Sequence, residues 1–153
     1  MIQRIQSVYL ALVAILCLLG LCLPLAQYFD GADTVASFNN FRFIMNAKGA
    51  TADWGPCALG VVQVLVIIIT VMAILLFRFR MRQLRLVIFT TILLVGYVAY
   101  YAILAWKFQM MTEATYHLCA AAIFPVLSII LNCMAIHGIR KDEALVRSLD
   151  RLR

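Results

Sequence analysis

The sequence predicts an all-α membrane protein, in which four transmembrane helices form an up-down bundle. The chain of 153 residues is 65% hydrophobic and only 13% charged, whereas an ordinary soluble domain is about 25% charged. Four long stretches contain no Asp, Glu, Lys or Arg, and the cationic side chains gather at their ends. These observations exclude a soluble globular domain. They also exclude an intrinsically disordered chain, because such chains are poor in apolar residues.

Each uncharged stretch is long enough to cross a bilayer. A helix needs about 20 apolar residues, at a rise of about 1.5 Å each, to span the hydrocarbon core. Strands of a transmembrane barrel would instead alternate in polarity and be about ten residues long. We therefore expect one membrane domain over residues 1–153. Its expected spans are residues 5–27, 56–77, 85–106 and 115–138.

The links between the spans predict the order of packing. The second link, Arg78–Arg85, is expected to be a tight basic turn, and the third, Lys107–Glu113, is also short. Short links place sequential helices side by side and antiparallel. The expected C-terminal tail, residues 139–153, leaves the bundle on the same side as the N-terminus.

The first loop, residues 28–55, is the sizeable segment outside the expected spans. Phe41, Arg42 and Phe43 alternate in polarity with period two, as in a strand that lies on an apolar surface. We expect a short β hairpin or an irregular cap that rests on the outer ends of the helices. The alternative is a disordered loop whose aromatic side chains touch lipid headgroups.

The arginines and lysines predict the orientation of the chain. Ten of them lie on the side of the termini and the second link, and three lie on the other side. Because short cytoplasmic segments are enriched in Lys and Arg, both termini are expected to be cytoplasmic. Topology thus accounts for the net charge of +6, and no nucleic-acid partner is expected.

The tail predicts an amphipathic helix on the cytoplasmic side. Apolar residues recur at helical spacing and charged residues take most of the other positions. Such a helix could lie on the anionic inner leaflet, dock in the groove of a partner protein, or simply continue the fourth helix. The candidate docking or lipid-surface residues are Leu145, Val146, Leu149, Leu152, Arg147 and Arg151.

Polar side chains inside the spans predict contacts between helices. Apart from Arg85 at the first position of the third span, the spans hold no Asp, Glu, Lys or Arg, and the absence of such a residue at mid-bilayer argues against a proton-coupled transporter or pump. Small polar side chains in lipid commonly join helices, and the candidates are Gln63, Thr70, Ser128 and Asn132. Asn132 is expected to face inward and to bind the third helix or backbone. Pro125 is expected to kink the fourth helix.

The sequence predicts no catalytic, cofactor-binding or metal site, and hence no enzyme. His117 and His137 are expected near opposite ends of one helix, about 30 Å apart by helical rise, so they cannot share a metal within a monomer. No C-x-x-C pair is present, unlike in small four-helix thiol oxidases. A single disulfide among Cys22, Cys57 and Cys119 at the outer face stays open as an alternative.

The two ends of the chain resemble those of a known protein family. The start MIQRIQSVYL and the tail IRKDEALVRSLDRLR resemble a family of small four-helix inner-membrane proteins of Bacteroidota-type bacteria, which is described only as a domain of unknown function. The resemblance covers the full length, with the M-I-Q-R-I-Q start and the R-K-D-E-x-L-V-R-S-x-D-R-L-R tail as its specific motifs. It implies a bacterial cytoplasmic (inner) membrane location, and it carries over no active-site residues.

We therefore expect a non-enzymatic integral membrane protein that is an accessory or scaffold subunit of a larger membrane assembly. Its partners would be the lipid bilayer and a membrane protein that docks on the tail or the outer loop. The alternative is a small transporter, channel or lipid-handling protein that acts as an oligomer, with a polar cavity lined by Gln63, Asn132 and tyrosines. A redox or quinone-linked enzyme is a third, less favoured, interpretation.

Overall fold

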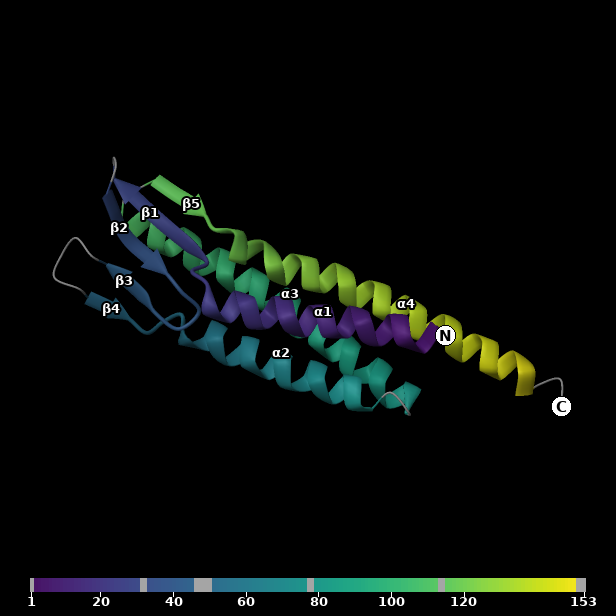
Figure 1. The fold of residues 1–153 in the computed structure, drawn as a ribbon. Coiled ribbons are helices and arrows are strands. Elements are labelled where there is room, and N and C mark those ends of the chain that lie inside the picture. Colours follow the sequence, from purple (N-terminus) through teal and green to yellow (C-terminus); the bar gives the residue numbers. More distant parts are fainter. Residues whose placement is uncertain (1, 31–32, 46–50, 77–78, 113–114, 151–153) are drawn as a thin grey trace.

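The computed structural model describes all of the chain except a few short segments. The described residues are 2–30, 33–45, 51–76, 79–112 and 115–150. Within them the chain forms four long helices with a β-sheet at one end (Figure 1). The helices are α1 (Ile2–Cys22), α2 (Cys57–Leu75), α3 (Arg80–Thr112) and α4 (Phe124–Asp150).

The helices pack side by side, and consecutive helices run in opposite directions (Figure 1). Helix α1 contacts α2 and α4, and α3 contacts the same two helices. Three described segments are long and apolar enough to cross a membrane, namely Cys57–Leu75, Met81–Met111 and Ala120–Lys141. The corresponding apolar part of α1, Ser7–Cys22, is shorter. The mostly helical architecture with four helices, three of them long and apolar enough to span, is thus confirmed.

A five-stranded antiparallel sheet covers one end of the helices, with the strand order β4-β3-β2-β1-β5. The expectation of an all-α protein with at most a hairpin or irregular cap was therefore wrong. The sheet is larger than a hairpin, and its β5 comes from the segment between α3 and α4 rather than from the first loop. The strands are β1 (Ala26–Asp30), β2 (Asp33–Phe38), β3 (Phe43–Met45), β4 (Thr51–Asp53) and β5 (Thr115–Leu118).

The fourth helix does not start at residue 115 as expected, because Thr115–Leu118 forms β5 instead. Residues 115–118 pair with β1 in register from Phe29↔Thr115 to Ala26↔Leu118. Without them β1 would present a row of unpaired backbone groups at the sheet edge. A short 3-10 helix, η1 (Ala120–Ile123), follows β5 and leads into α4.

Pro125, the expected site of a kink, lies at the start of the fourth helix and not within it. Pro125 is the second residue of α4. A proline in the first turn removes no helical hydrogen bond, because the N–H groups there have no partner within the helix. Pro125 therefore lies where proline is well tolerated, in the first turn of the helix.

Helix α3 is longer at both ends than the expected span 85–106. It begins at Arg80, inside the segment expected to be a turn, and it ends at Thr112. Its 33 residues correspond to about 50 Å of helix, against about 30 Å for the hydrocarbon core of a bilayer. The last turns of α3 accordingly extend past the other helices, and they form the surface on which the sheet lies (Figure 1).

The sheet packs on α3 through an alternating set of buried residues. Phe43 stacks on Phe108 with ring centroids 4.0 Å apart, and Phe38 stacks on Tyr101 at 5.5 Å. Successive side chains of a strand point to opposite faces, so that alternate residues can share one buried face. The buried strand residues are Ala26, Tyr28, Ala36, Phe38 and Phe43.

The tail continues α4 without a break in its helical backbone as far as Asp150, and it projects beyond the other helices (Figure 1). The side chains of residues 142–150 are outside the described part of the structure, and so are residues 151–153. The candidate tail residues therefore stay predictions. This set is Leu145, Val146, Arg147, Leu149, Arg151 and Leu152.

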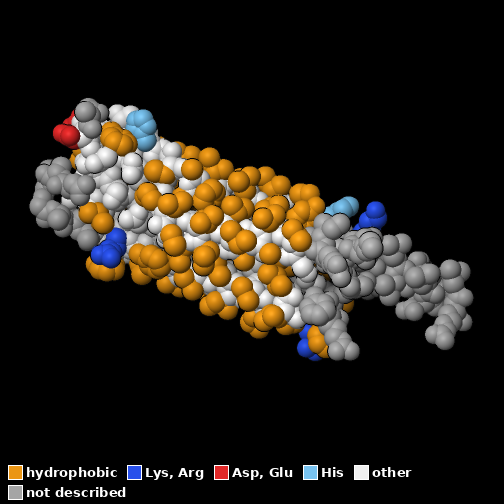
Figure 2. Space-filling model, in the orientation of Figure 1, with side chains coloured by type: hydrophobic (Ala, Val, Ile, Leu, Met, Phe, Trp, Pro, Cys, Tyr) orange, Lys and Arg blue, Asp and Glu red, His pale blue; other side chains and the backbone are white. Residues whose placement is uncertain are grey.

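The outer surface of the helices is apolar between two polar ends. Figure 2 shows hydrophobic side chains along the helical part of the visible face, with charged side chains near the sheet and near the opposite end. Large exposed apolar side chains occur along all four helices, for example Ile15, Ile68, Ile92 and Ile130. Soluble monomers rarely expose large contiguous apolar surfaces.

We predict that Gly60→Ala lowers the free energy of unfolding by about 1–3 kcal/mol, as overpacking does. A Cβ at Gly60 would overlap the ring of Phe41. Chemical unfolding of the purified protein, followed by circular dichroism, measures the effect. The matched control is Gly96→Ala, because a Cβ there meets nothing within 4 Å, and it should be neutral or stabilising by up to about 1 kcal/mol.

The double variant Gly60→Ala/Phe41→Ala separates this packing effect from helix propensity. We expect Gly60→Ala to lower the free energy of unfolding much less in the Phe41→Ala background than in the wild-type background. Equal losses in both backgrounds would contradict the contact between Phe41 and Gly60.

Candidate functional site

Asn40 joins the sheet to three helices. Its side chain is completely buried. Its Nδ2 donates to the carbonyl oxygen of Gly20 on α1 at 2.6 Å, and its Oδ1 accepts from the hydroxyl of Tyr97 on α3 at 2.6 Å. Its backbone carbonyl accepts from the N–H of Gly60 on α2 at 3.0 Å. One residue thereby fixes the sheet against α1, α2 and α3.

Local sequence explains why Asn40 reaches this position. It lies in the turn between β2 and β3, which the N–H of Asn39 closes onto the carbonyl of Arg42 at 2.9 Å, and asparagine is favoured in turns. The last carbonyls and first N–H groups of helices lack partners within the helix. Asn40 serves both needs, since Gly20 lies in the last turn of α1 and Gly60 in the first turn of α2.

A second set of polar side chains lies deeper between α1, α2 and α4. Gln63 Nε2 donates to the carbonyl of Cys17 at 3.1 Å. The Cys17 sulfur lies 3.8 Å from the hydroxyl of Ser128, which itself donates to the carbonyl of Phe124 at 2.8 Å. Since Gln63, Cys17 and Ser128 are all buried, these contacts cross the interior of the bundle.

A third polar contact joins α4 to α3. Asn132 Nδ2 donates to Thr90 Oγ1 at 3.4 Å, and Asn132 is fully buried. This is the inward contact with the third helix that the sequence predicts for Asn132. Thr70 is buried as well, but its hydroxyl donates at 2.7 Å to Val66 of its own helix.

The four polar candidates therefore do not form one site. All of them are buried, yet Gln63 and Asn132 take part in different contacts. Two of their oxygens, Gln63 Oε1 and Asn132 Oδ1, have no hydrogen-bond partner in the structure as described. Buried polar atoms almost always have a partner, so these two oxygens mark positions that packing alone does not explain.

Tyrosine hydroxyls join the sheet to the C-terminal half of α3. The hydroxyl of Tyr28 on β1 donates to the carbonyl of Ala105 at 3.1 Å, and the hydroxyls of Tyr101 and Tyr116 are 2.6 Å apart. Burial raises the pKa of Tyr28 above its usual range, and the nearby Tyr116 adds to this shift. The Tyr28 phenol therefore stays protonated and remains a hydrogen-bond donor throughout the physiological pH range.

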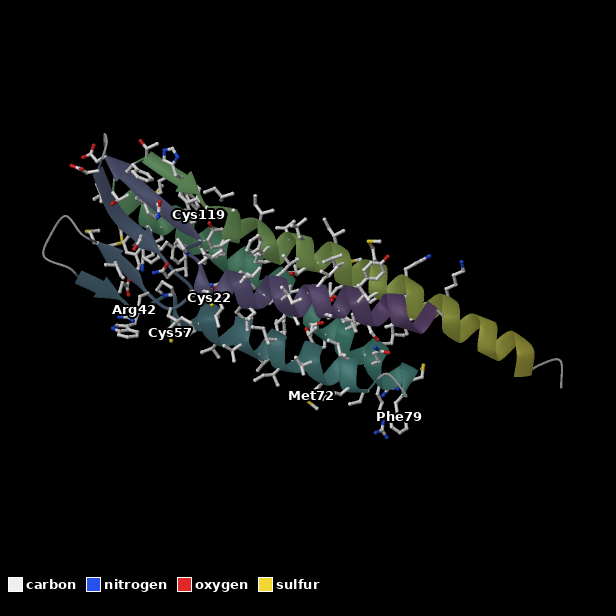
Figure 3. The ribbon with its side chains drawn as sticks, in the orientation of Figure 1. Cys22, Arg42, Cys57, Met72, Phe79 and Cys119 are labelled. Carbon is white, nitrogen blue, oxygen red and sulfur yellow. The ribbon has the colours of Figure 1, made fainter. Side chains whose placement is uncertain are left out.

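A cationic and aromatic pair lies exposed at the sheet end. The guanidinium of Arg42 is 5.2 Å from the ring centroid of Trp54, within the range of a cation–π interaction. Figure 3 labels Arg42 beside Cys57, near the start of α2. Aromatic side chains gather at membrane–water interfaces, which fits the position of this pair at the edge of the apolar surface.

The histidines and cysteines do not gather into a site. His117 lies on β5, where its ring meets Phe29 at 5.1 Å, so the expectation that it shares a helix with His137 was wrong. All five cysteines are free thiols, although Cys22, Cys57 and Cys119 are near the sheet end, as Figure 3 shows. In the part of the chain that the structure describes, no three His, Cys, Asp or Glu side chains form a metal-binding group.

Comparison with protein families identifies the chain's relatives. The family described as "Domain of unknown function (DUF4293)" matches residues 2–152. The chain belongs to this family. The match confirms the expected membership of an uncharacterised domain family and gives no residue of the DUF4293 chain a role. Comparison with curated proteins finds no match.

The partnership of Asn40 with Tyr97 was not predicted from the sequence. The pair Asn39–Asn40 has the composition of a turn, and this signal could have located the bend between two strands. Nothing in the local sequence indicates that the Asn40 amide binds a helix end 20 residues before it, or that its backbone carbonyl binds a helix start 20 residues after it.

We predict that Asn40→Ala lowers the free energy of unfolding by about 2–5 kcal/mol. The change removes two hydrogen bonds and leaves the buried carbonyl of Gly20 and the hydroxyl of Tyr97 unpaired, at about 1–3 kcal/mol each. Chemical unfolding measures the loss. Thr70→Val is the control, because its hydroxyl bonds only a carbonyl of its own helix among the contacts described, and it should change stability by less than about 1 kcal/mol.

A double-mutant cycle with Tyr97→Phe tests the pair directly. The cost of Tyr97→Phe should be smaller in the Asn40→Ala background than in the wild type, since the shared hydrogen bond is already absent. Strictly additive losses would contradict the proposed coupling.

Proposed function

We propose that this chain is a non-enzymatic integral membrane protein of the bacterial cytoplasmic membrane, an accessory or scaffold subunit of a larger membrane assembly. The observation that carries the proposal is the attachment of the sheet to three helices through Asn40. A sheet held in this way is a rigid platform with a fixed position relative to the bundle. Rigid elements present a binding surface more accurately than loops do.

The membrane location rests on the helices and their surface. The 19 residues of Cys57–Leu75 give about 28 Å of helix, close to the thickness of a hydrocarbon core. Exposed apolar side chains cover the helical part of the molecule in the view of Figure 2. Burial of this surface in lipid is the simplest way to remove it from water.

The orientation rests on the distribution of cations. Exposed Arg82, Arg85, Arg140 and Lys141 lie at the end opposite the sheet. The positive-inside rule then places that end, with both termini, in the cytoplasm and the sheet outside. The helical continuation of α4 gives the assembly a second docking element on the cytoplasmic side.

Cysteine labelling tests the orientation. In a cysteine-free background, Asp33→Cys in the sheet and Arg82→Cys at the opposite end both replace exposed residues. We predict that a membrane-impermeant maleimide labels Asp33→Cys in right-side-out spheroplasts, and labels Arg82→Cys only after the membrane is permeabilised. Labelling of Arg82→Cys in sealed spheroplasts would contradict the orientation.

Site-specific photo-crosslinking tests the scaffold function. A benzophenone amino acid is placed at Trp54 near the sheet or at Ile92 on the bundle, which are 62% and 63% exposed and therefore well matched. We predict a discrete protein adduct from position 54 in native membranes and lipid adducts from position 92. The complex should also be isolated at a defined native mass, and Asn40→Ala should reduce its yield, because the sheet is then less firmly attached.

A second candidate function is a small transporter, channel or lipid-handling protein that acts as an oligomer. The buried and unpartnered oxygens of Gln63 and Asn132 favour it, because polar groups inside a membrane bundle often mark a solute path. In the crosslinking experiment this candidate predicts adducts between copies of the chain at position 92. A native mass of a homo-oligomer with no other protein would replace the scaffold proposal with this one.

A further inference from the structure

Two amide side chains inside the helix bundle have hydrogen-bonding capacity that the described protein atoms do not meet. Gln63 on α2 and Asn132 on α4 are both 0% exposed. Gln63 Oε1 and Asn132 Oδ1 have no hydrogen-bond partner within the described structure. Each atom is a strong acceptor in a place of low polarity, where an unmet acceptor is strongly destabilising.

The orientation of the Gln63 amide is fixed by its neighbours. Its Nε2 donates to the carbonyl of Cys17. Rotation of the amide by half a turn would place Oε1 against that carbonyl and bring two acceptors together. A Cβ at Gly20 would lie 3.3 Å from Nε2, so the amide also packs closely against α1. The unmet acceptor of Gln63 is therefore Oε1 and cannot be exchanged for Nε2.

The same reasoning fixes the amide of Asn132. The hydroxyl of Thr90 donates its single proton to the carbonyl of Val87 at 2.9 Å. Thr90 Oγ1 can then only accept, so Asn132 must approach it with Nδ2. The unmet acceptor of Asn132 is accordingly Oδ1.

The nearby donors are already used. The hydroxyl proton of Ser128 goes to the carbonyl of Phe124, so the thiol of Cys17 is the donor in its contact with Ser128. Ser128 and Asn132 are one helical turn apart on α4, and Gln63 contacts Cys17. Gln63 and Asn132 therefore belong to two separate sets of polar contacts, and in each set an amide oxygen still requires a donor.

We propose that Gln63 Oε1 and Asn132 Oδ1 each bind an internal water molecule, which donates a hydrogen bond to the amide oxygen. Water is the neutral donor that most commonly satisfies buried polar atoms. A metal cation is disfavoured, because the buried polar residues of the described structure contain no acidic side chain and an unpaired charge would be strongly destabilising there. The inference is independent of the scaffold function, since it concerns hydration of the bundle whatever the chain binds.

X-ray hydroxyl-radical footprinting of the full-length protein in lipid nanodiscs tests the Gln63 site. Radicals formed from a bound water oxidise side chains beside it, and Cys17 is a reactive sulfur that is only 1% exposed. We expect Cys17 to be oxidised, and the lipid-facing Cys133, which is exposed in the structure, to be protected. Gln63→Leu should abolish oxidation of Cys17, whereas the matched buried change Thr70→Val should leave it unaltered.

The outcomes that overturn the Gln63 site are distinct. An unoxidised Cys17 in the wild type, or equal oxidation of Cys17 in the folded Gln63→Leu variant, shows that no water is bound by the amide. Replacement of Na⁺ and K⁺ by choline should change nothing. Loss of the Cys17 signal in choline would assign the oxygen to a cation instead.

Water-edited solid-state NMR of the wild-type protein in bilayers tests the Asn132 site without a variant. Magnetisation from water should reach the side-chain amide of Asn132 in a short mixing time, as it does for exposed amides. Absence of this transfer, while the side-chain amides of Asn39 and Gln27 in the sheet region show it, would overturn the site. The same spectrum reads the Gln63 amide, so the assignment does not depend on the folding of Gln63→Leu.

Discussion

The burial of the Asn40 amide is the constraint on which the arrangement of sheet and helices depends. An amide removed from bulk water needs both a donor and an acceptor, which the chain or a bound water supplies. The Asn40 amide meets this need with Gly20 on α1 and Tyr97 on α3, while the Asn40 backbone carbonyl accepts from Gly60 on α2. The end of α1, the start of α2 and the middle of α3 are thereby brought to one point, and the strands on either side of Asn40 are held over them.

The length of α3 is the second condition for the sheet. A small sheet with one apolar face is not stable alone, and it needs a surface on which to bury that face. The last turns of α3 supply this surface through Tyr101 and Phe108, whose rings stack on Phe38 and Phe43. The helix that is longest in the chain is therefore also the one that supports the sheet.

The helices and the inward position of their polar residues were predicted from the sequence, because both follow from the hydrophobicity of the residues and their spacing along a helix. It did not predict β5, since Thr115–Leu118 is short and lies within an uncharged stretch that resembles a span. Hydrophobicity measures how favourably a side chain leaves water, and it does not indicate which backbone segments pair in a sheet. Asn40 was missed for a related reason, because its partners are distant in sequence and only the folded chain brings them together.

The strand order β4-β3-β2-β1-β5 gives the bundle unequal stiffness along its length. One hydrogen-bonded sheet joins the connection between α1 and α2 to the connection between α3 and α4. It thereby links the sheet-side ends of all four helices. At the opposite end the helices are held by side-chain packing around residues such as Leu10, Val87 and Ile139. We therefore expect the relative movement of the helices to be smallest beside the sheet and largest at the arginine-rich end, where backbone hydrogen bonds do not join them.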